Sequence, residues 1–188
     1  YASSGEIFGT QSKKINERSK KNPKNPYALS KHISMIYIKY MRKFFNLNIS
    51  SGILFNHDSE FRPKNNFVKK IINYLNTGNF SKKLKLGNLD VHRDFGLARE
   101  YIVAMYKINQ QKKAGDYIIA SGKSVKIRDV VKYAFSLKKL NYKNHTIIDK
   151  VKYPNKSLKF NSLSIAKINK INWFPKKDIY DLMKNLIK

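Results

Sequence analysis

The sequence contains no cysteine, which excludes a disulfide scaffold and a zinc site with thiolate ligands. No apolar run approaches the roughly 20 residues that a membrane-spanning helix needs. The histidines, at positions 32, 57, 92 and 145, lie too far apart to suggest a structural metal site. No signal peptide opens the chain, so we expect a cytoplasmic protein without a membrane partner.

Acidic side chains are scarce: 12 Asp and Glu stand against 39 Lys and Arg, a formal net charge of +27. Such an excess points first to nucleic acid. Lys supplies most of this positive charge, however, whereas proteins that bind phosphates or bases favour Arg, whose guanidinium group makes bidentate hydrogen bonds to them. Enrichment of Lys, Asn and Ile together favours compositional drift, with attraction of an anionic small molecule as the second interpretation and a nucleic-acid surface as the third. We expect no nucleic-acid partner, although a positive field would concentrate an anionic substrate.

The 188 residues are 41% hydrophobic, which is enough for one sizeable core. Apolar side chains that recur at spacings of three and four predict helices, and short apolar runs predict strands. Because the two kinds of segment alternate, the expected class is α/β. Residues 10–26 and 56–66 read as loops. The predicted helices are 27–45, 67–75, 94–110, 127–137 and 178–187, and the predicted strands are 51–55, 84–86, 116–120 and 146–151.

A Tyr and a Lys four residues apart lie on one helix face, and an ammonium near a phenol makes the phenol a usable proton acceptor. Tyr27 and Lys31 form such a pair, and so do Tyr180 and Lys184. With 12 Tyr and abundant Lys, pairs of this kind also arise by chance. We read the pair in the tail as part of a solvated helix face. The first pair has context, because Ser-Ser-Gly-Glu stands about 20 residues upstream at a predicted strand end, where α/β folds place their sites.

This combination resembles the extended short-chain dehydrogenase/reductase family, in which a Ser or Thr joins a Tyr-x-x-x-Lys helix at the nicotinamide. Two further segments are similar to those of GDP-mannose 4,6-dehydratases. They are residues 52–59 (GILFNHDS) and 86–101 (LGNLDVHRDFGLAREY). The resemblance covers residues 1–135 well and the tail weakly.

The resemblance implies a partial doubly wound (Rossmann-type) parallel sheet plus a small α/β substrate-binding lobe. Residues 1–60 would be the C-terminal part of the NADP-binding domain. Residues 61–188 would be mainly the substrate-binding lobe, with some segments returning to the sheet. It also implies a homo-oligomer, a dimer or tetramer, when the protein is intact.

The resemblance also assigns roles in the conversion of GDP-mannose to its 4-keto-6-deoxy product. Ser4 would hydrogen-bond the sugar 4-hydroxyl, and Tyr27, tuned by Lys31, would deprotonate it as hydride leaves C4 for NADP. The new ketone acidifies the C5 proton, which Glu6 would remove as water is lost. A reductase or epimerase of this fold needs no acid at that position. Tyr27, Lys31, His57 and Arg62 would contact the cofactor, and Asn56, Arg93 and Lys70 (or Lys69) the nucleotide sugar, Arg93 being suited to a diphosphate.

Each of these residues also has a plainer interpretation. Glu6 fits a solvated loop acid, and Ser4 fits the cap of a local turn. His57 fits a hydrogen-bonded core histidine. Arg62 and Arg93 fit ion pairs with neighbouring acids such as Glu60 and Asp94.

The chain departs from the family pattern in several places. It contains no Gly-x-x-Gly-x-x-Gly turn for pyrophosphate. We therefore expect the C-terminal half or more of a longer enzyme, inactive alone. Gly5 stands where Ser is usual, Phe8 where Tyr is usual, and residues 153–156 (YPNK) replace Arg-Pro-x-Glu. The alternatives are another nucleotide-sugar epimerase, dehydratase or reductase of this fold, a degenerate inactive fragment, and a basic nucleic-acid-binding module.

Overall fold

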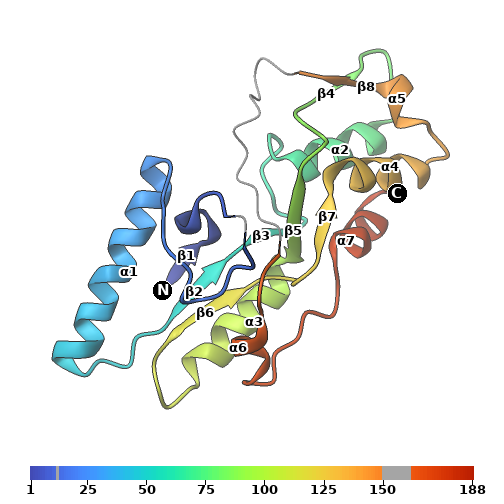
Figure 1. Ribbon diagram of the computed structural model, residues 1–188. Coiled ribbons are helices and arrows are strands. Elements are labelled where there is room, and N and C mark those ends of the chain that lie inside the picture. Colours follow the sequence, from blue (N-terminus) through green and yellow to red (C-terminus); the bar gives the residue numbers. More distant parts are fainter. Residues whose placement is uncertain (12, 150–161) are drawn as a thin grey trace.

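A computed structural model describes residues 1–11, 13–149 and 162–188 (Figure 1). Residues 153–156, where the sequence departs from the family pattern, lie outside the described residues. None of the helices in the described ranges is long and apolar enough to cross a membrane. Within the same ranges, no group of three or more His, Asp or Glu side chains could hold a metal ion.

The central sheet is parallel and has the order β1-β2-β6. Its strands are β1 (Ala2–Ser4), β2 (Ser51–Leu54) and β6 (Asp116–Ile119). Ser4 is opposite Leu54 in the register, so β1 and β2 end at the same edge. The helices α1 (Pro26–Phe45) and α3 (Ala98–Asn109) lie in the connections between these strands. This arrangement confirms the predicted α/β class with a parallel, Rossmann-type sheet.

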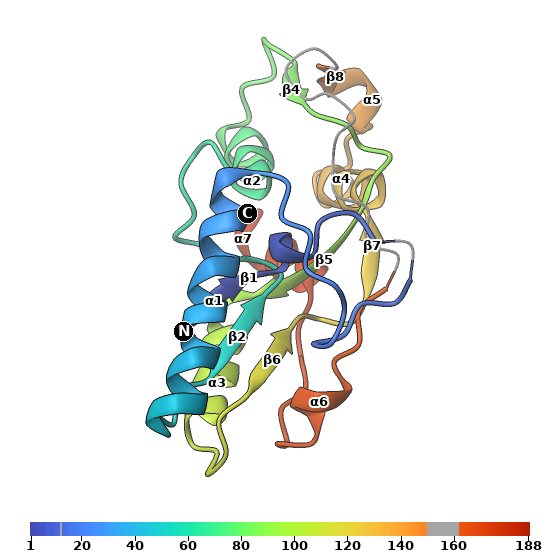
Figure 2. The ribbon, with the colours of Figure 1, turned by 60° about the vertical axis from the view of Figure 1, so that its left-hand side comes forward.

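The two helices cover opposite faces of this sheet. Successive side chains of a strand point to opposite sides, so neighbouring residues of β6 pack against different helices. Ile53 and Ile118 pack in one buried cluster with Met35 of α1. Ile119 packs in a second cluster, to which Met105 of α3 contributes. Figure 2 shows α1 in front of β1 and β2, with α3 behind them. The sheet is therefore buried on both faces, as is usual for parallel strands.

The start and end of α1 follow from its flanking residues. Asn25 is the N-cap, and its side-chain oxygen accepts a hydrogen bond from the backbone N–H of Ala28. Pro26 follows at the first helical position, where its fixed φ suits the helix. Asn46 ends the helix in the left-handed conformation. Tyr27 and Lys31 therefore lie in the first two turns of a long, well-capped helix.

A second group of elements carries its own core, composed of residues after position 66. Figure 1 shows α2, α4 and α7 gathered at one end of the molecule, away from α1. The strand β5 pairs in parallel with β3 and antiparallel with β7, and β4 pairs in parallel with β8. The elements of this part are β3 (Asn56–Asp58), α2 (Phe67–Thr77), β4 (Leu84–Leu86), β5 (His92–Leu97), β7 (Ser124–Lys126), α4 (Ile127–Ser136), α5 (Tyr142–His145), β8 (Thr146–Ile148) and α7 (Ile179–Leu186). The short helix α6 (Ala166–Asn169) packs instead against β6 of the central sheet.

The short strand β7 was not predicted, and two other segments have a conformation that differs from the predicted one. Residues 94–97 belong to β5 rather than to the first turn of a helix, so α3 begins only at Ala98. Residues 56–58 form β3 where a loop was predicted. In both places hydrogen bonding to a distant strand, rather than local side-chain spacing, sets the backbone conformation.

Candidate functional site

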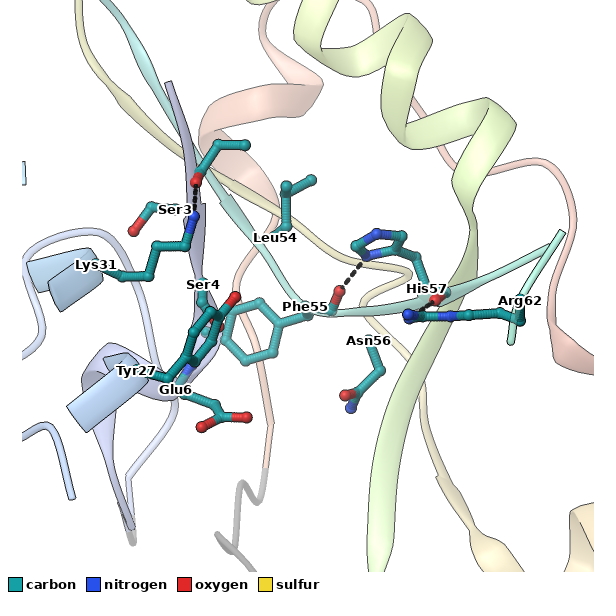
Figure 3. A pocket seen from close by; sticks show the side chains of 12 residues that line it. Ser3, Ser4, Glu6, Tyr27, Lys31, Leu54, Phe55, Asn56, His57 and Arg62 are labelled. Carbon is teal, nitrogen blue, oxygen red and sulfur yellow. Dashed lines mark hydrogen bonds between the residues drawn. The ribbon is translucent and has the colours of Figure 1, made fainter. Parts of the chain in front are cut away.

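A cavity of about 320 Å³ opens beyond the carboxyl ends of β1 and β2 (Figure 3). Loops that leave adjacent parallel strands at the same edge form such a cavity. The structure brings together seven residues to which the sequence assigned a role. They are Ser4, Glu6, Tyr27, Lys31, Asn56, His57 and Arg62, and Ala2, Ser3, Gly5, Leu54 and Phe55 complete the lining.

The cavity has two sides that come from different strands. Figure 3 shows Ser4, Glu6, Tyr27 and Lys31 on one side and His57 and Arg62 on the other, with the Phe55 ring between them. The first side is formed by β1, the short 3-10 helix η1 (Gly5–Phe8) and the start of α1. The second is formed by β3 and the segment that follows it. A ligand that fills the cavity would therefore contact both the connection from β1 to β2 and the connection from β2 to β6.

The side chain of Ser4 caps the turn that carries Glu6. Its Oγ accepts a hydrogen bond from the backbone N–H of Glu6 at 3.2 Å, as the plainer interpretation of this residue predicted. The same side chain nevertheless lines the cavity. The Glu6 carboxylate is partly exposed, and its Oε2 accepts a hydrogen bond from Asn25 Nδ2 at 2.8 Å. Both groups are thus held beside the N-terminus of α1.

Tyr27 and Lys31 extend from α1 toward this cavity. The Tyr27 side chain is 53% exposed, and Lys31 Nζ lies 5.7 Å from the centroid of its ring. Lys31 Nζ also donates a hydrogen bond to the carbonyl oxygen of Ala2 at 2.9 Å. The ammonium is therefore held between β1 and the phenol. Both side chains line the cavity.

The second Tyr/Lys pair has a different environment. Tyr180 lies on α7, and its ring stands edge-on to that of Tyr133 at 5.0 Å between centroids. Burial, followed by the nearby charge of Asp129, raises the pKa of Tyr180. A raised pKa is the opposite of what a proton acceptor needs. Tyr180 packs between α7 and α4, and only Lys184 lies on the exposed helix face that the sequence predicted for both residues.

His57 and Arg62 are both held by the backbone. The His57 Nδ1 lies 2.8 Å from the Phe55 carbonyl oxygen, which can only accept, so Nδ1 carries a proton. In the neutral ring Nε2 is then an acceptor. Arg62 donates from Nη2 to the His57 carbonyl oxygen at 2.6 Å and from Nε to Asp58 Oδ1 at 3.0 Å. Its ion-pair partner is therefore Asp58, not the predicted Glu60, whose carboxylate pairs with Arg99.

The structure adds one residue to the site that the sequence did not suggest. Asp58 is only 3% exposed, and its carboxylate orients Arg62. Burial raises the pKa of Asp58, and the adjacent Arg62 opposes that effect. The sequence offered one signal, since Asp58 and Arg62 are four residues apart. This spacing suggests a contact only within a helix, whereas these two residues meet across the turn that follows β3.

Two predicted substrate-binding residues do not line this cavity. Lys70 lies on α2, while its neighbour Lys69 donates from Nζ to the Glu60 carbonyl oxygen. Arg93 lies half-buried on β5, where burial lowers its pKa and the charge of Glu6 opposes that effect. The roles of Lys70 and Arg93 stay predictions.

Asp94, suggested by sequence as a partner for Arg93, is turned inward. Its side chain is 6% exposed, and Oδ1 accepts a hydrogen bond from the backbone N–H of Ser121 at 2.7 Å. Burial raises the pKa of Asp94 to about 6. Asp94 Oδ2 and the hydroxyl of Tyr101 are buried without a hydrogen-bond partner among the described residues. Asp94 thus joins β5 to the segment that follows β6, at an electrostatic cost.

A parallel sheet covered on both faces, with a Ser and a Tyr-x-x-x-Lys helix at its carboxyl edge, defines the short-chain dehydrogenase/reductase class. The structure of RMD from Pseudomonas aeruginosa complexed with NADPH superposes with a TM-score of 0.86 at 21% identity, over 100% of this chain and 64% of that one. DesIV, a dTDP-glucose 4,6-dehydratase from Streptomyces venezuelae with NAD and TYD bound, gives 0.84 at 17% identity, over 100% and 57%. At such identities the likeness establishes the fold.

The chain belongs to the GDP-mannose 4,6-dehydratase family, whose sequence model matches residues 1–185. GDP-mannose 4,6 dehydratase 1 of Arabidopsis thaliana is 36% identical over 151 residues, which are 79% of this chain and 42% of the relative. The GDP-mannose 4,6 dehydratase of Drosophila melanogaster is 29% identical over an alignment of 209 residues, gaps included, which covers 100% of this chain and 53% of that protein. The chain spans about half the length of the curated relatives it matches. The predicted family membership is confirmed.

Proposed function

We propose that the intact protein converts GDP-mannose to GDP-4-keto-6-deoxymannose as a lyase with a bound NADP. The observation that carries the proposal is that Ser4, Glu6, Tyr27 and Lys31 line one cavity. Ser, Tyr and Lys suffice for oxidation of an alcohol. The added carboxylate of Glu6 is what an elimination requires, because a general base must remove the proton next to the new ketone.

In this mechanism Tyr27 accepts the proton of the sugar 4-hydroxyl, while Ser4 Oγ hydrogen-bonds that hydroxyl. An NADP held by these residues would supply the hydride acceptor for C4 and the hydride donor for C6. Glu6 removes the C5 proton once the 4-ketone has made it acidic, and the C6 hydroxyl takes up a proton and leaves as water. The hydride and a proton then add to C6 and C5, so that the net change is loss of one water.

The residues of the cavity fit a nicotinamide dinucleotide. Lys31 and Arg62 supply cationic donors, and His57 has a fixed ring whose Nε2 accepts a hydrogen bond in the neutral form. We propose that Tyr27, Lys31, His57 and Arg62 contact this cofactor. Asn56, Lys70 and Arg93 are then proposed for the nucleotide sugar. The solved structures with this fold contain NADPH in one case and NAD in another, and we propose NADP for this protein.

The substrate proposal is tested by incubating the intact protein with GDP-mannose in deuterated water. We expect loss of one water by mass spectrometry and one deuterium at C5 by NMR. GDP-glucose, dTDP-glucose and UDP-glucose serve as matched substrates and are expected to react at least tenfold more slowly. A product of unchanged mass would identify an epimerase, and preferred turnover of a dTDP or UDP sugar would contradict the guanosine assignment.

We also propose that the intact protein is a homo-oligomer, with α1 at the contact between copies. A stripe of apolar side chains on this helix is exposed, each of them between 49% and 62%. Burying such a stripe against a second copy would remove it from water. The stripe consists of Leu29, Ile33, Ile36, Tyr37, Tyr40 and Phe44.

Replacing Tyr37 by Lys is expected to shift the intact protein toward smaller species, because it places a charge inside the proposed contact. The control is Tyr106→Lys on α3, since Tyr106 is similarly exposed, 66% against 62%, but lies beyond the opposite face of the sheet. Light scattering after size exclusion measures the mass. An equal effect of both substitutions, or of neither, would contradict an α1 contact.

A further inference from the structure

We infer that Asn25 is a positioning residue that fixes the carboxylate of Glu6 to the start of the helix that carries Tyr27. The inference rests on the proposed function, in which Glu6 is the base. The connection is a single side chain: Asn25 Oδ1 accepts from the Ala28 backbone N–H at 2.7 Å, and Asn25 Nδ2 donates to Glu6 Oε2 at 2.8 Å.

The orientation of this amide follows from its hydrogen bonds. A side-chain amide offers an acceptor on one atom and donors on the other. The backbone N–H of Ala28 can only donate, so it must meet the Oδ1 of Asn25. Nδ2 is thereby directed toward Glu6, whose ionised carboxylate can only accept. In the two hydrogen bonds that connect Ala28, Asn25 and Glu6, each donor thus meets an acceptor.

The backbone around this contact is held as well. The N–H of Asn22 donates to the Ile7 carbonyl oxygen at 2.8 Å, which joins η1 to the segment before α1. Gly9, at φ +61°, ends η1, and a Cβ on Gly9 would lie 2.2 Å from the Asn22 carbonyl oxygen. Pro26 has a fixed φ between Asn25 and Tyr27. The carboxylate and the phenol are therefore positioned by the same start of α1.

A neutral amide suits this position chemically. The hydrogen-bond partner of Oε2 is the neutral amide of Asn25, while the charge of Glu6 also acts on Arg93. A cation in place of the amide, in direct contact with Oε2, would compete with the proton that a base must accept. The amide instead orients the carboxylate through Oε2, and we assign the C5 proton to Oε1. Two reacting groups that act in succession on C4 and C5 need such a fixed mutual geometry.

Two substitutions separate this role from helix capping, because Asn, Asp and Ser are all good N-caps. Asn25→Ser keeps the cap but is too short to reach Glu6. Asn25→Asp keeps both length and cap but places a second carboxylate against Glu6. In the intact protein we expect both variants to retain thermal stability and the rate of C4 oxidation, measured as cofactor reduction in a single turnover.

Exchange of the C5 proton with deuterated solvent is the step expected to change. We expect a slowing of about tenfold in Asn25→Ser and about 100-fold in Asn25→Asp, with the acid limb of the exchange profile about one pH unit higher in Asn25→Asp. Wild-type exchange in both variants would overturn the inference alone. So would equal losses of C4 oxidation and C5 exchange, which indicate a merely structural role. Absence of C5 exchange in the wild type would overturn the proposed function and the inference together.

Discussion

Replacing Glu6 by Gln in the intact protein is expected to lower dehydration of GDP-mannose at least 100-fold while leaving oxidation at C4 intact. Gln has nearly the same shape as Glu and can still contact Asn25, but it cannot take the C5 proton. Loss of a general base typically costs between 100-fold and 10,000-fold. Because the hydride is not returned, reduced cofactor and the 4-keto sugar should accumulate on the enzyme. Cofactor absorbance and rapid-quench mass spectrometry follow the two steps separately.

The control for this prediction is Tyr27→Phe, which removes the proposed proton acceptor of the earlier step. This variant should neither reduce the cofactor nor dehydrate the sugar, although both ligands still bind. The two variants therefore stop the reaction at different points. Dehydration by Glu6→Gln within tenfold of the wild-type rate would show that another group is the base.

Replacing Asp94 by Asn is expected to stabilise the protein at neutral pH and to leave it unchanged near pH 4. The folded state holds the pKa of Asp94 at about 6 through burial, whereas an unfolded Asp titrates near 3.9. A raised acid pKa means that the folded state prefers the protonated form. The free energy of unfolding therefore falls as pH rises between about 4 and 6, and the full cost, at most about 3 kcal/mol, is present above pH 6.

An Asn at position 94 avoids this cost, since it carries no charge and its Oδ1 can still accept from Ser121. Denaturation of the intact protein from pH 4 to pH 8 measures the effect. The control is Asp90→Asn, because Arg128 and Lys126 lower the pKa of Asp90 to about 2. That change should reduce stability slightly at neutral pH. A stability difference between wild type and Asp94→Asn that does not vary with pH would contradict the prediction.

The parts of the site that could be predicted share a local signal. Tyr27 and Lys31 lie on a long helix whose apolar periodicity and preceding Pro26 are visible in the sequence. Ser4 and Glu6 follow a strand, and the tendency of parallel strands to place their carboxyl ends together was enough to put both groups beside that helix. The structure brings these residues to one cavity, and their chemical roles stay predictions.

The parts that could not be predicted depend on distant partners. The strands β3 and β7 have three residues each, too few for an alternating pattern. In residues 94–97 the spacing of Leu97 with later apolar residues predicts a helix, but pairing of β5 with β3 and β7 makes this segment a strand. Asn25 and Pro26 fall in the segment 10–26, which the sequence predicts to be a loop. The role of Asn25 as cap and as partner of Glu6 becomes visible only when η1 is folded against α1.

The placement of the arginines bears on the high positive charge. Four of them have their guanidinium groups engaged by acids of the same chain, which favours compositional drift over a nucleic-acid surface as the origin of the Lys excess. The pairs are Arg42 with Asp116, Arg62 with Asp58, Arg99 with Glu60 and Arg128 with Asp90.

The buried cluster shared by α2, α4 and α7 has no member on β1, β2 or β6. A substitution within it consequently leaves the packing of Ile53 and Ile118 beneath α1 untouched. Mutations that reshape this end of the molecule can accumulate without disturbing η1 and α1, which hold the proposed acid and phenol. Variation at this end of the molecule is therefore separable from the positions of the proposed reacting groups.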